Sequence, residues 1–230
     1  MAAFQAAVDL GYRYLETDIH ATADGVLVAF HDDRLDRVTD RTGLIAELNW
    51  SEVRMARLGV GEPIVRFEEL LDAFPAARIN VDPKHDAAVG GLIDALRNPR
   101  IAERLCVGSF SDRRVAEVRR AIGPAACTAL TPWEIAALRA ASWGARPLLD
   151  RLRRRPGRCV QVPLRSWGGL PLVDARLIEA AHHLGLPVHA WTVNDAAEME
   201  RLLELGIDGL FTDRPAALRS VLADRGQWTG

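Results

Sequence analysis

The chain alternates between two hydrophobic patterns, and this alternation predicts an α/β fold. Short runs rich in Val, Ile, Leu and Tyr recur between segments of helical spacing, with Gly, Pro or Asp at the joins. The predicted strands are Tyr12–Ile19, Arg78–Pro83, Leu105–Ser109, Ala126–Leu130, Cys159–Pro163, Pro187–Val193 and Asp208–Thr212. Most of these strands are too apolar to have one face in water, which favours a parallel sheet covered by helices.

Helical periodicity predicts helices between the strands and one helix before the first strand. The predicted helices are Met1–Leu10, Trp50–Leu58, Phe67–Ala73, Ala87–Arg97, Asp112–Ala121, Pro132–Ala141, Asp174–Leu184, Ala196–Leu205 and Pro215–Leu222. Pro132 and Pro215 suit a first helical turn, and Gly185 and Gly206 suit helix ends. The order is therefore strand, helix, strand, helix.

One segment breaks the alternation just after the first strand. Within His20–Phe30, the Asp24-Gly25 pair separates short extended pieces and predicts a hairpin or a sharp reversal. The following segment, Asp33–Val65, is predicted to be rich in loops. The basic run Arg151–Arg158 lies between two elements and is interpreted as a solvated loop.

Seven parallel-type strands preceded by a helix favour a (β/α)8 TIM barrel that lacks its first β-strand, because such a barrel has eight strands. A doubly wound open sheet tolerates seven strands and is the alternative. No strand is followed by a dinucleotide-binding or P-loop glycine motif, which disfavours that alternative. With no linker or shift of composition, residues 1–230 are predicted to form a single domain.

Composition narrows the classes of function. The 230 residues are 49% hydrophobic, which is enough for a large core. The 29 Lys and Arg residues against 31 Asp and Glu residues leave a net charge of -2, which argues against a polybasic nucleic-acid-binding protein. No apolar stretch approaches the roughly 18 residues of a transmembrane span, and the first residues contain no basic leader. We therefore expect no transmembrane segment and a cytoplasmic protein.

Acidic side chains gather on one face of two predicted strands. The period of two puts Glu16 and Asp18 on the same face of their strand, and it puts Asp82 and Lys84 on the same face of the next. Converging carboxylates repel one another unless a positive charge lies between them. Oxygen ligands of this kind suit a hard divalent cation, so Glu16, Asp18 and Asp82 are candidate metal ligands and Lys84 is an adjacent cation.

Two further residues are candidates because they follow strand-like segments. His31 comes after the apolar piece Val26–Phe30, and its imidazole can serve as general acid or base near neutral pH. Trp191 ends the penultimate strand, where an aromatic ring can pack against the apolar part of a substrate, although ordinary barrel packing explains it equally well.

Several motifs, in order, resemble those of the glycerophosphodiester phosphodiesterase family. They are Leu15-Glu16-Thr17-Asp18, Thr22-Ala23-Asp24-Gly25-Val26-Leu27-Val28, His31-Asp32, Leu35-Asp36-Arg37-Val38-Thr39, Phe67-Glu68-Glu69-Leu70-Leu71, Asn80-Val81-Asp82-Pro83-Lys84, Trp191-Thr192-Val193-Asn194 and Gly206-Ile207-Asp208-Gly209-Leu210-Phe211-Thr212-Asp213-Arg214-Pro215. The resemblance covers essentially the whole chain, and its first block is the most specific part.

The resemblance implies a (β/α)8 barrel that hydrolyses glycerophosphodiesters, its small-molecule substrates, to glycerol 3-phosphate and an alcohol with a divalent cation, usually Ca2+ or Mg2+. It implies that Glu16 and Asp18 are metal ligands, that His31 is one of two catalytic histidines, and that Lys84 faces the phosphate. Asp82 stands where the family more often has Glu.

The family pattern opens with a strand ending in His-Arg-Gly, which this sequence does not contain. We therefore expect the chain to lack one catalytic histidine and a neighbouring arginine, and to be weakly active or inactive. A fragment of a longer sequence accounts for the difference most simply. A metal- or phosphoester-binding module without turnover remains an alternative. A phospholipase-type phosphodiesterase with an apolar rim, suggested only by Trp167 and Trp191, is another.

Overall fold

The computed structural model describes residues 1–145, 147–153, 157–165, 169 and 171–229. Trp167 and the middle of the basic run, residues 154–156, therefore lie outside the described residues. The chain divides into two compact units, Met1–Cys127 and Thr128–Gly230, which are described separately. Within the described residues, no helix combines the length and the apolar character that a bilayer span requires.

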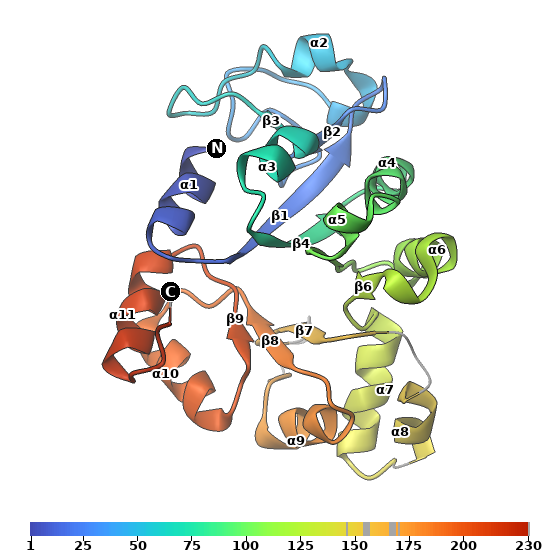
Figure 1. Ribbon diagram of the computed structural model, residues 1–230, viewed down its shortest axis with the longest axis vertical. Helices are drawn as coiled ribbons and strands as arrows, with labels where there is room; N and C mark the ends of the chain where they lie inside the picture. Colours follow the sequence, from blue (N-terminus) through green and yellow to red (C-terminus); the bar gives the residue numbers. More distant parts are fainter. Residues whose placement is uncertain (146, 154–156, 166–168, 170, 230) are drawn as a thin grey trace. The chain divides into compact units, whose positions relative to one another are not determined.

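The first unit contains a mixed sheet and the helices that pack on it (Figure 1). Its elements are α1 (Ala2–Asp9), β1 (Tyr14–Ala21), β2 (Leu27–Ala29), the 3-10 helix η1 (Ile45–Glu47), α2 (Trp50–Val53), β3 (Val65–Arg66), α3 (Phe67–Ala73), β4 (Arg78–Pro83), α4 (Ala87–Leu96), α5 (Pro99–Ala102), β5 (Leu105–Val107), α6 (Asp112–Ile122) and η2 (Gly123–Ala125). The strand β6 (Cys127–Thr128) lies at the boundary of the two units. The order across this sheet is β3-β2-β1-β4-β5-β6.

The parallel pairing of β1 with β4 sets the geometry of the predicted site. Their register places Glu16 beside Asn80 and Asp18 beside Asp82. Buried residues such as Ile19, Ile79 and Val81 fix this register, because a slip by one residue would turn them away from the core. The side chains of Asp18 and Asp82 are thereby held side by side on neighbouring strands.

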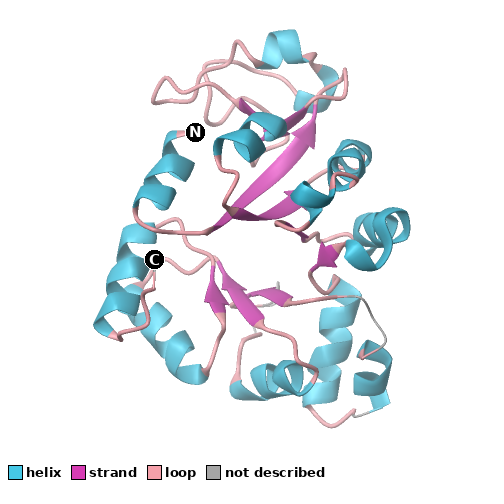
Figure 2. Cartoon of the chain, viewed as in Figure 1, coloured by secondary structure: helices cyan, strands magenta, loops and turns pink. Residues whose placement is uncertain are grey.

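The predicted hairpin after the first strand is confirmed. β2 runs antiparallel to β1, with Ile19 opposite Ala29, and Gly25 has φ +84° at the turn. The segment between β2 and β3 is mostly loop, as predicted, and Figure 2 shows it with only short helical pieces. A small core of its own, including Leu35, Ile45 and Val53, holds this segment together.

The second unit contains short parallel strands separated by helices (Figure 2). Its elements are α7 (Pro132–Ser142), α8 (Pro147–Leu152), β7 (Val160–Pro163), α9 (Ala175–His183), β8 (Val188–Trp191), α10 (Ala196–Leu205), β9 (Gly209–Leu210) and α11 (Pro215–Asp224). The strand order is β7-β8-β9, with β7 parallel to β8 and β8 parallel to β9. Residues of β7 and β8 such as Val160 and Ala190 are fully buried, which agrees with the apolar pattern of these strands.

All seven predicted parallel strands are present, although most are shorter than predicted. The predicted helix Trp50–Leu58 is wrong beyond Val53. The backbone N–H of Arg57 donates to the Asp40 carboxylate at 2.7 Å, so a tertiary acceptor replaces the helical carbonyl. The interpretation of Arg151–Arg158 as a loop is also wrong at its start, because Arg151 lies in the last turn of α8.

Arg104 anchors β4, the strand that carries Asp82 and ends just before Lys84. Its guanidinium donates to the carbonyl oxygens of Leu71 at 2.6 Å and Phe74 at 2.9 Å, which lie at the end of α3. Its own carbonyl accepts from the N–H of Ile79 on β4 at 2.7 Å. Arg104 therefore donates hydrogen bonds to carbonyls at the end of α3, and it ties α3 to β4.

Replacing Arg104 with Met should lower the free energy of unfolding by about 1–3 kcal/mol, because charge-assisted hydrogen bonds to helix-end carbonyls are lost. Urea denaturation followed by circular dichroism measures this change. Arg100→Met, on the exposed side of α5, is the matched control and should leave the unfolding midpoint nearly unchanged. Equal midpoints for the two variants would contradict the anchoring role.

Candidate active site

A lysine joins the two acidic side chains that the β1–β4 register brings together. Lys84 Nζ lies 2.7 Å from Asp18 Oδ1 and 3.2 Å from Asp82 Oδ2. All three side chains are largely buried, with exposed fractions of 26%, 13% and 17% for Lys84, Asp18 and Asp82. The positive charge that the converging carboxylates require is thus supplied by Lys84 in this structure.

Burial and charge shift the pKa values of this cluster. Burial raises the pKa of Asp82, and it outweighs the opposing charge and hydrogen bond of Lys84. Burial alone would lower the pKa of Lys84, but the hydrogen bond to Asp18 and the charges of both carboxylates raise it above its usual value. The lysine therefore stays protonated, while Asp82 holds its negative charge less readily than an exposed aspartate.

His31 is brought to this cluster by the β1–β2 hairpin. The backbone N–H of Phe30 donates to the Asp18 carbonyl at 3.0 Å, which places His31 just beyond the end of β2. The His31 side chain is 71% exposed, and its Nδ1 lies 2.7 Å from the Asp32 carboxylate. His31 is thus an accessible imidazole whose ring contacts a carboxylate.

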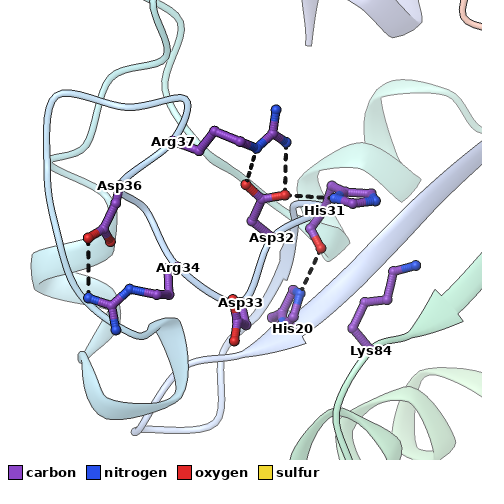
Figure 3. A pocket seen from close by; sticks show the side chains of 8 residues that line it. All are labelled: His20, His31, Asp32, Asp33, Arg34, Asp36, Arg37 and Lys84. Atoms are coloured by element: carbon purple, nitrogen blue, oxygen red, sulfur yellow. Dashed lines mark hydrogen bonds and ion pairs between the residues drawn. The ribbon is translucent and has the colours of Figure 1, made fainter.

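These residues border an open pocket of about 530 Å³ (Figure 3). Its lining residues are His20, His31, Asp32, Asp33, Arg34, Asp36, Arg37 and Lys84. Among the predicted residues, His31 and Lys84 line this pocket, and Asp18 and Asp82 hold Lys84 beside it. An imidazole beside an ammonium group is suited to proton transfer at an anionic substrate.

His20 is a pocket residue that the sequence reasoning missed. It continues the face of Glu16 and Asp18, but the predicted strand stopped at Ile19, whereas β1 runs to Ala21. The His20 side chain is buried, burial lowers its pKa, and its Nε2 donates to the His31 carbonyl at 3.2 Å. Alternate residues of a strand share a face, so extending the alternation from Glu16 and Asp18 to the next residue of that face would have identified His20.

The other predicted residues lie outside this pocket lining. Glu16 is exposed on β1, two residues before Asp18. Within the described part of the chain, no three His, Cys, Asp or Glu side chains converge with the geometry of a metal site. Trp191 ends β8 in the second unit and is half-buried.

Comparison with known proteins identifies the family. The sequence profile of the Glycerophosphoryl diester phosphodiesterase family matches residues 1–217. A Mycobacterium tuberculosis protein named "Probable glycerophosphodiester phosphodiesterase 2" is 40% identical over 235 residues, spanning 100% of this chain and 87% of the relative. The chain belongs to the glycerophosphoryl diester phosphodiesterase family. The family predicted from the sequence motifs is therefore confirmed.

Solved structures of other glycerophosphodiester phosphodiesterases share the fold of this family member. A structure from Agrobacterium tumefaciens aligns with a TM-score of 0.75 at 21% identity, covering 96% of this chain and 91% of that one. A phosphodiesterase from Oleispira antarctica, solved with its product sn-glycerol-3-phosphate, aligns with a TM-score of 0.73 at 19% identity, covering 96% and 89%. The predicted (β/α)8 TIM-barrel class is confirmed.

Replacing Lys84 with Met should destabilise the metal-free protein by roughly 2 kcal/mol near neutral pH, because Asp18 and Asp82 then face each other without a cation. The destabilisation should shrink towards pH 4, because the raised pKa of Asp82 lets this carboxyl take up a proton first. Urea denaturation in EDTA at the two pH values measures both effects.

The matched control is Arg78→Met, which removes a positive charge from the exposed first residue of β4. This variant should show a small effect without the same dependence on pH. A loss of stability for Lys84→Met that is equal at both pH values would contradict the proposed repulsion between the carboxylates.

Proposed function

We propose that the chain catalyses the metal-assisted hydrolysis of glycerophosphodiesters to glycerol 3-phosphate and an alcohol. The observation that carries this proposal is that an accessible imidazole, His31, and a protonated amine, Lys84, line the same pocket in a member of this family. The related Oleispira antarctica phosphodiesterase, which was solved with sn-glycerol-3-phosphate, supports the same product here.

Lys84 would face the phosphodiester. Its amine is held in place by Asp18 and Asp82, so it presents positive charge without first having to be ordered. Negative charge builds on the phosphoryl oxygens during hydrolysis, and a pre-oriented cation stabilises that charge. Lys84 thus serves both the stability of the carboxylate pair and the binding of an anion.

The same carboxylates fit a divalent cation, Ca2+ or Mg2+, in the chemistry of their donor atoms. Lys84 contacts Asp18 at Oδ1 and Asp82 at Oδ2, and carboxylate oxygens are hard donors of the kind that these cations prefer. We propose that Glu16, Asp18 and Asp82 supply hard oxygen ligands at this edge of β1 and β4. A bound ion of this kind would neutralise phosphoryl charge and orient the substrate.

His31 would transfer a proton. Either a water molecule attacks phosphorus, or the adjacent hydroxyl of the glycerol attacks it and water then opens the resulting cyclic phosphodiester. In both routes the bond from phosphorus to the alcohol oxygen breaks, and the alcohol leaves with a proton. His31 takes a proton from the attacking oxygen or delivers one to the leaving oxygen. His20 donates its Nε2–H to a carbonyl and is buried, so we assign proton transfer in the described pocket to His31.

With His31 as the one accessible imidazole among the described pocket residues, we propose that turnover by these 230 residues is slow. We also propose that residues 1–230 act as one barrel domain and that Trp191 contacts the apolar part of the substrate, because an aromatic ring at a strand end suits this role. Binding of Ca2+ or of a phosphoester without hydrolysis, measured by calorimetry, would favour the alternative of a binding module.

Replacing Asp18 with Asn should lower the hydrolysis rate by about 100-fold or more. The substitution weakens the binding of the cation and removes the ion pair that positions Lys84. The assay measures glycerol 3-phosphate released from glycerophosphocholine in Ca2+ or Mg2+. EDTA should abolish the wild-type rate, and added cation should restore it.

Asp94→Asn is the control, because Asp94 is exposed and pairs with the exposed Arg97. It should retain the wild-type rate. Unchanged hydrolysis by Asp18→Asn, or in EDTA, would overturn the metal-assisted mechanism.

Replacing His31 with Gln should lower kcat by about 10²–10⁴-fold and leave the affinity for the cation unchanged, because a proton carrier is lost but no proposed ligand is removed. Steady-state kinetics and calorimetric titration with Ca2+ measure the two quantities. His183→Gln, on α9 of the second unit, should change neither. A kcat within a few-fold of the wild type would rule out His31 as the proton carrier.

A further inference from the structure

The orientation of the His31 ring depends on one hydrogen bond. Its backbone is held on both sides: Phe30 N–H donates to the Asp18 carbonyl, and the His31 carbonyl accepts from His20. The ring itself is 71% exposed, so packing does little to restrict its rotation. The contact of Nδ1 with the Asp32 carboxylate, at 2.7 Å, is what fixes the ring.

Arg37 in turn binds both oxygens of the Asp32 carboxylate, which contacts His31 (Figure 3); this two-oxygen contact is called the grip. Arg37 Nε donates to Asp32 Oδ2 at 2.6 Å, and Arg37 Nη2 donates to Asp32 Oδ1 at 2.8 Å. Oδ1 is also the oxygen that contacts His31. Both carboxylate oxygens are therefore engaged, and the plane of the carboxylate is set by the planar guanidinium.

We propose that Arg37 is a positioning residue for the reaction. By holding both oxygens of Asp32, Arg37 fixes the position of the carboxylate beside His31, and because a carboxylate only accepts hydrogen bonds, His31 carries its proton on Nδ1 and turns Nε2 towards the pocket. This inference rests on the proposed role of His31 as the proton carrier. Arg37 touches neither the ring nor the reacting atoms, so its effect passes through Asp32.

The electrostatics agree with this arrangement. The hydrogen bonds from Arg37 and from His31 hold the pKa of Asp32 well below its usual range. Asp32 is therefore ionised, and an ionised carboxylate only accepts hydrogen bonds. The neutral His31 ring can meet it only through a protonated Nδ1.

The neighbouring ion pair in the same loop provides a contrast. Arg34 contacts Asp36 through a single hydrogen bond of 3.2 Å, and both side chains are at least 40% exposed. The Asp32 side chain is only 16% exposed, although Arg37 is 67% exposed. The grip on Asp32 is thus the more buried and more directional of the two pairs.

This geometry makes a specific prediction for Asp32→Ala. Asp32 Oδ1 accepts from both His31 and Arg37, and Oδ2 accepts from Arg37, so alanine removes the acceptor of His31 together with both contacts of Arg37. Without that acceptor the preference for a proton on Nδ1 is lost, and the ring should carry its proton on Nε2, the tautomer that a free histidine favours. Because Arg37 acts through Asp32, removing Arg37 as well should have no further effect.

The first test observes the tautomer directly and does not depend on activity. Nitrogen-15 NMR of the His31 ring, assigned with His31→Gln, should show Nδ1 protonated in the wild type. It should show Nε2 protonated in Asp32→Ala, and a mixture of the two tautomers in Arg37→Met, in which the carboxylate is no longer held in place. An unchanged tautomer in all three proteins would overturn the proposal.

The second test is kinetic. Arg37→Met alone should lower kcat about tenfold with KM within about twofold, and Asp32→Ala should lower kcat by about 10²–10³-fold. The double variant, Asp32→Ala with Arg37→Met, should have the same kcat as Asp32→Ala, because Arg37 acts through Asp32. A double variant about tenfold slower than Asp32→Ala would contradict this role of Arg37.

Two further variants separate charge from geometry. Arg41→Gln removes an equal charge from an exposed position of the same loop and should leave tautomer and kcat unchanged. Arg37→Lys keeps the charge but can bind only one oxygen, so its kcat should lie between those of Arg37→Met and the wild type. A wild-type kcat for Arg37→Lys would show that charge alone suffices and would overturn the two-oxygen grip.

The two tests also distinguish this proposal from the proposed function. If the wild type does not hydrolyse glycerophosphodiesters but the tautomer switches as described, the function is wrong and the grip stands. If hydrolysis occurs but the tautomer does not change and the two losses of kcat add, the positioning role of Arg37 is wrong and the function stands.

Discussion

The site depends on the ion cluster formed by Lys84 with Asp18 and Asp82. Two carboxylates on adjacent parallel strands would repel each other in a buried place, and the lysine between them removes that cost. The β1–β4 register makes the cluster, and Arg104 anchors β4 to the end of α3. The stability of this cluster and the proposed binding of the phosphodiester thus rely on the same positive charge.

Hydrogen bonds of the backbone and of neighbouring side chains position the His31 imidazole. The β1–β2 hairpin returns the chain to the end of β1, so that His31 reaches the cluster only 11 residues after His20. Backbone hydrogen bonds hold the main chain of His31, and Asp32 with Arg37 holds its ring. The exposed ring is therefore oriented by polar contacts rather than by packing, which leaves it open to a substrate.

Much of the fold and part of the site could be predicted because they depend on local patterns. The seven parallel strands, the hairpin at Asp24-Gly25 and the shared face of Glu16 and Asp18 all follow from the period of two and from turn residues. The end of α2 could not be predicted, because the Asp40 carboxylate takes the N–H of Arg57 from 17 residues away. His20 was missed because the predicted strand ended one residue too early.

By itself, the sequence determined the family, the alternation of strands and helices, and which acidic, basic and imidazole side chains stand at strand ends. These follow from residue type and short spacing. Only the tertiary structure decided that Lys84 lies between Asp18 and Asp82, and that Arg37 reaches back to Asp32. Strand register and loop path set these contacts, and both result from packing between segments distant in the sequence.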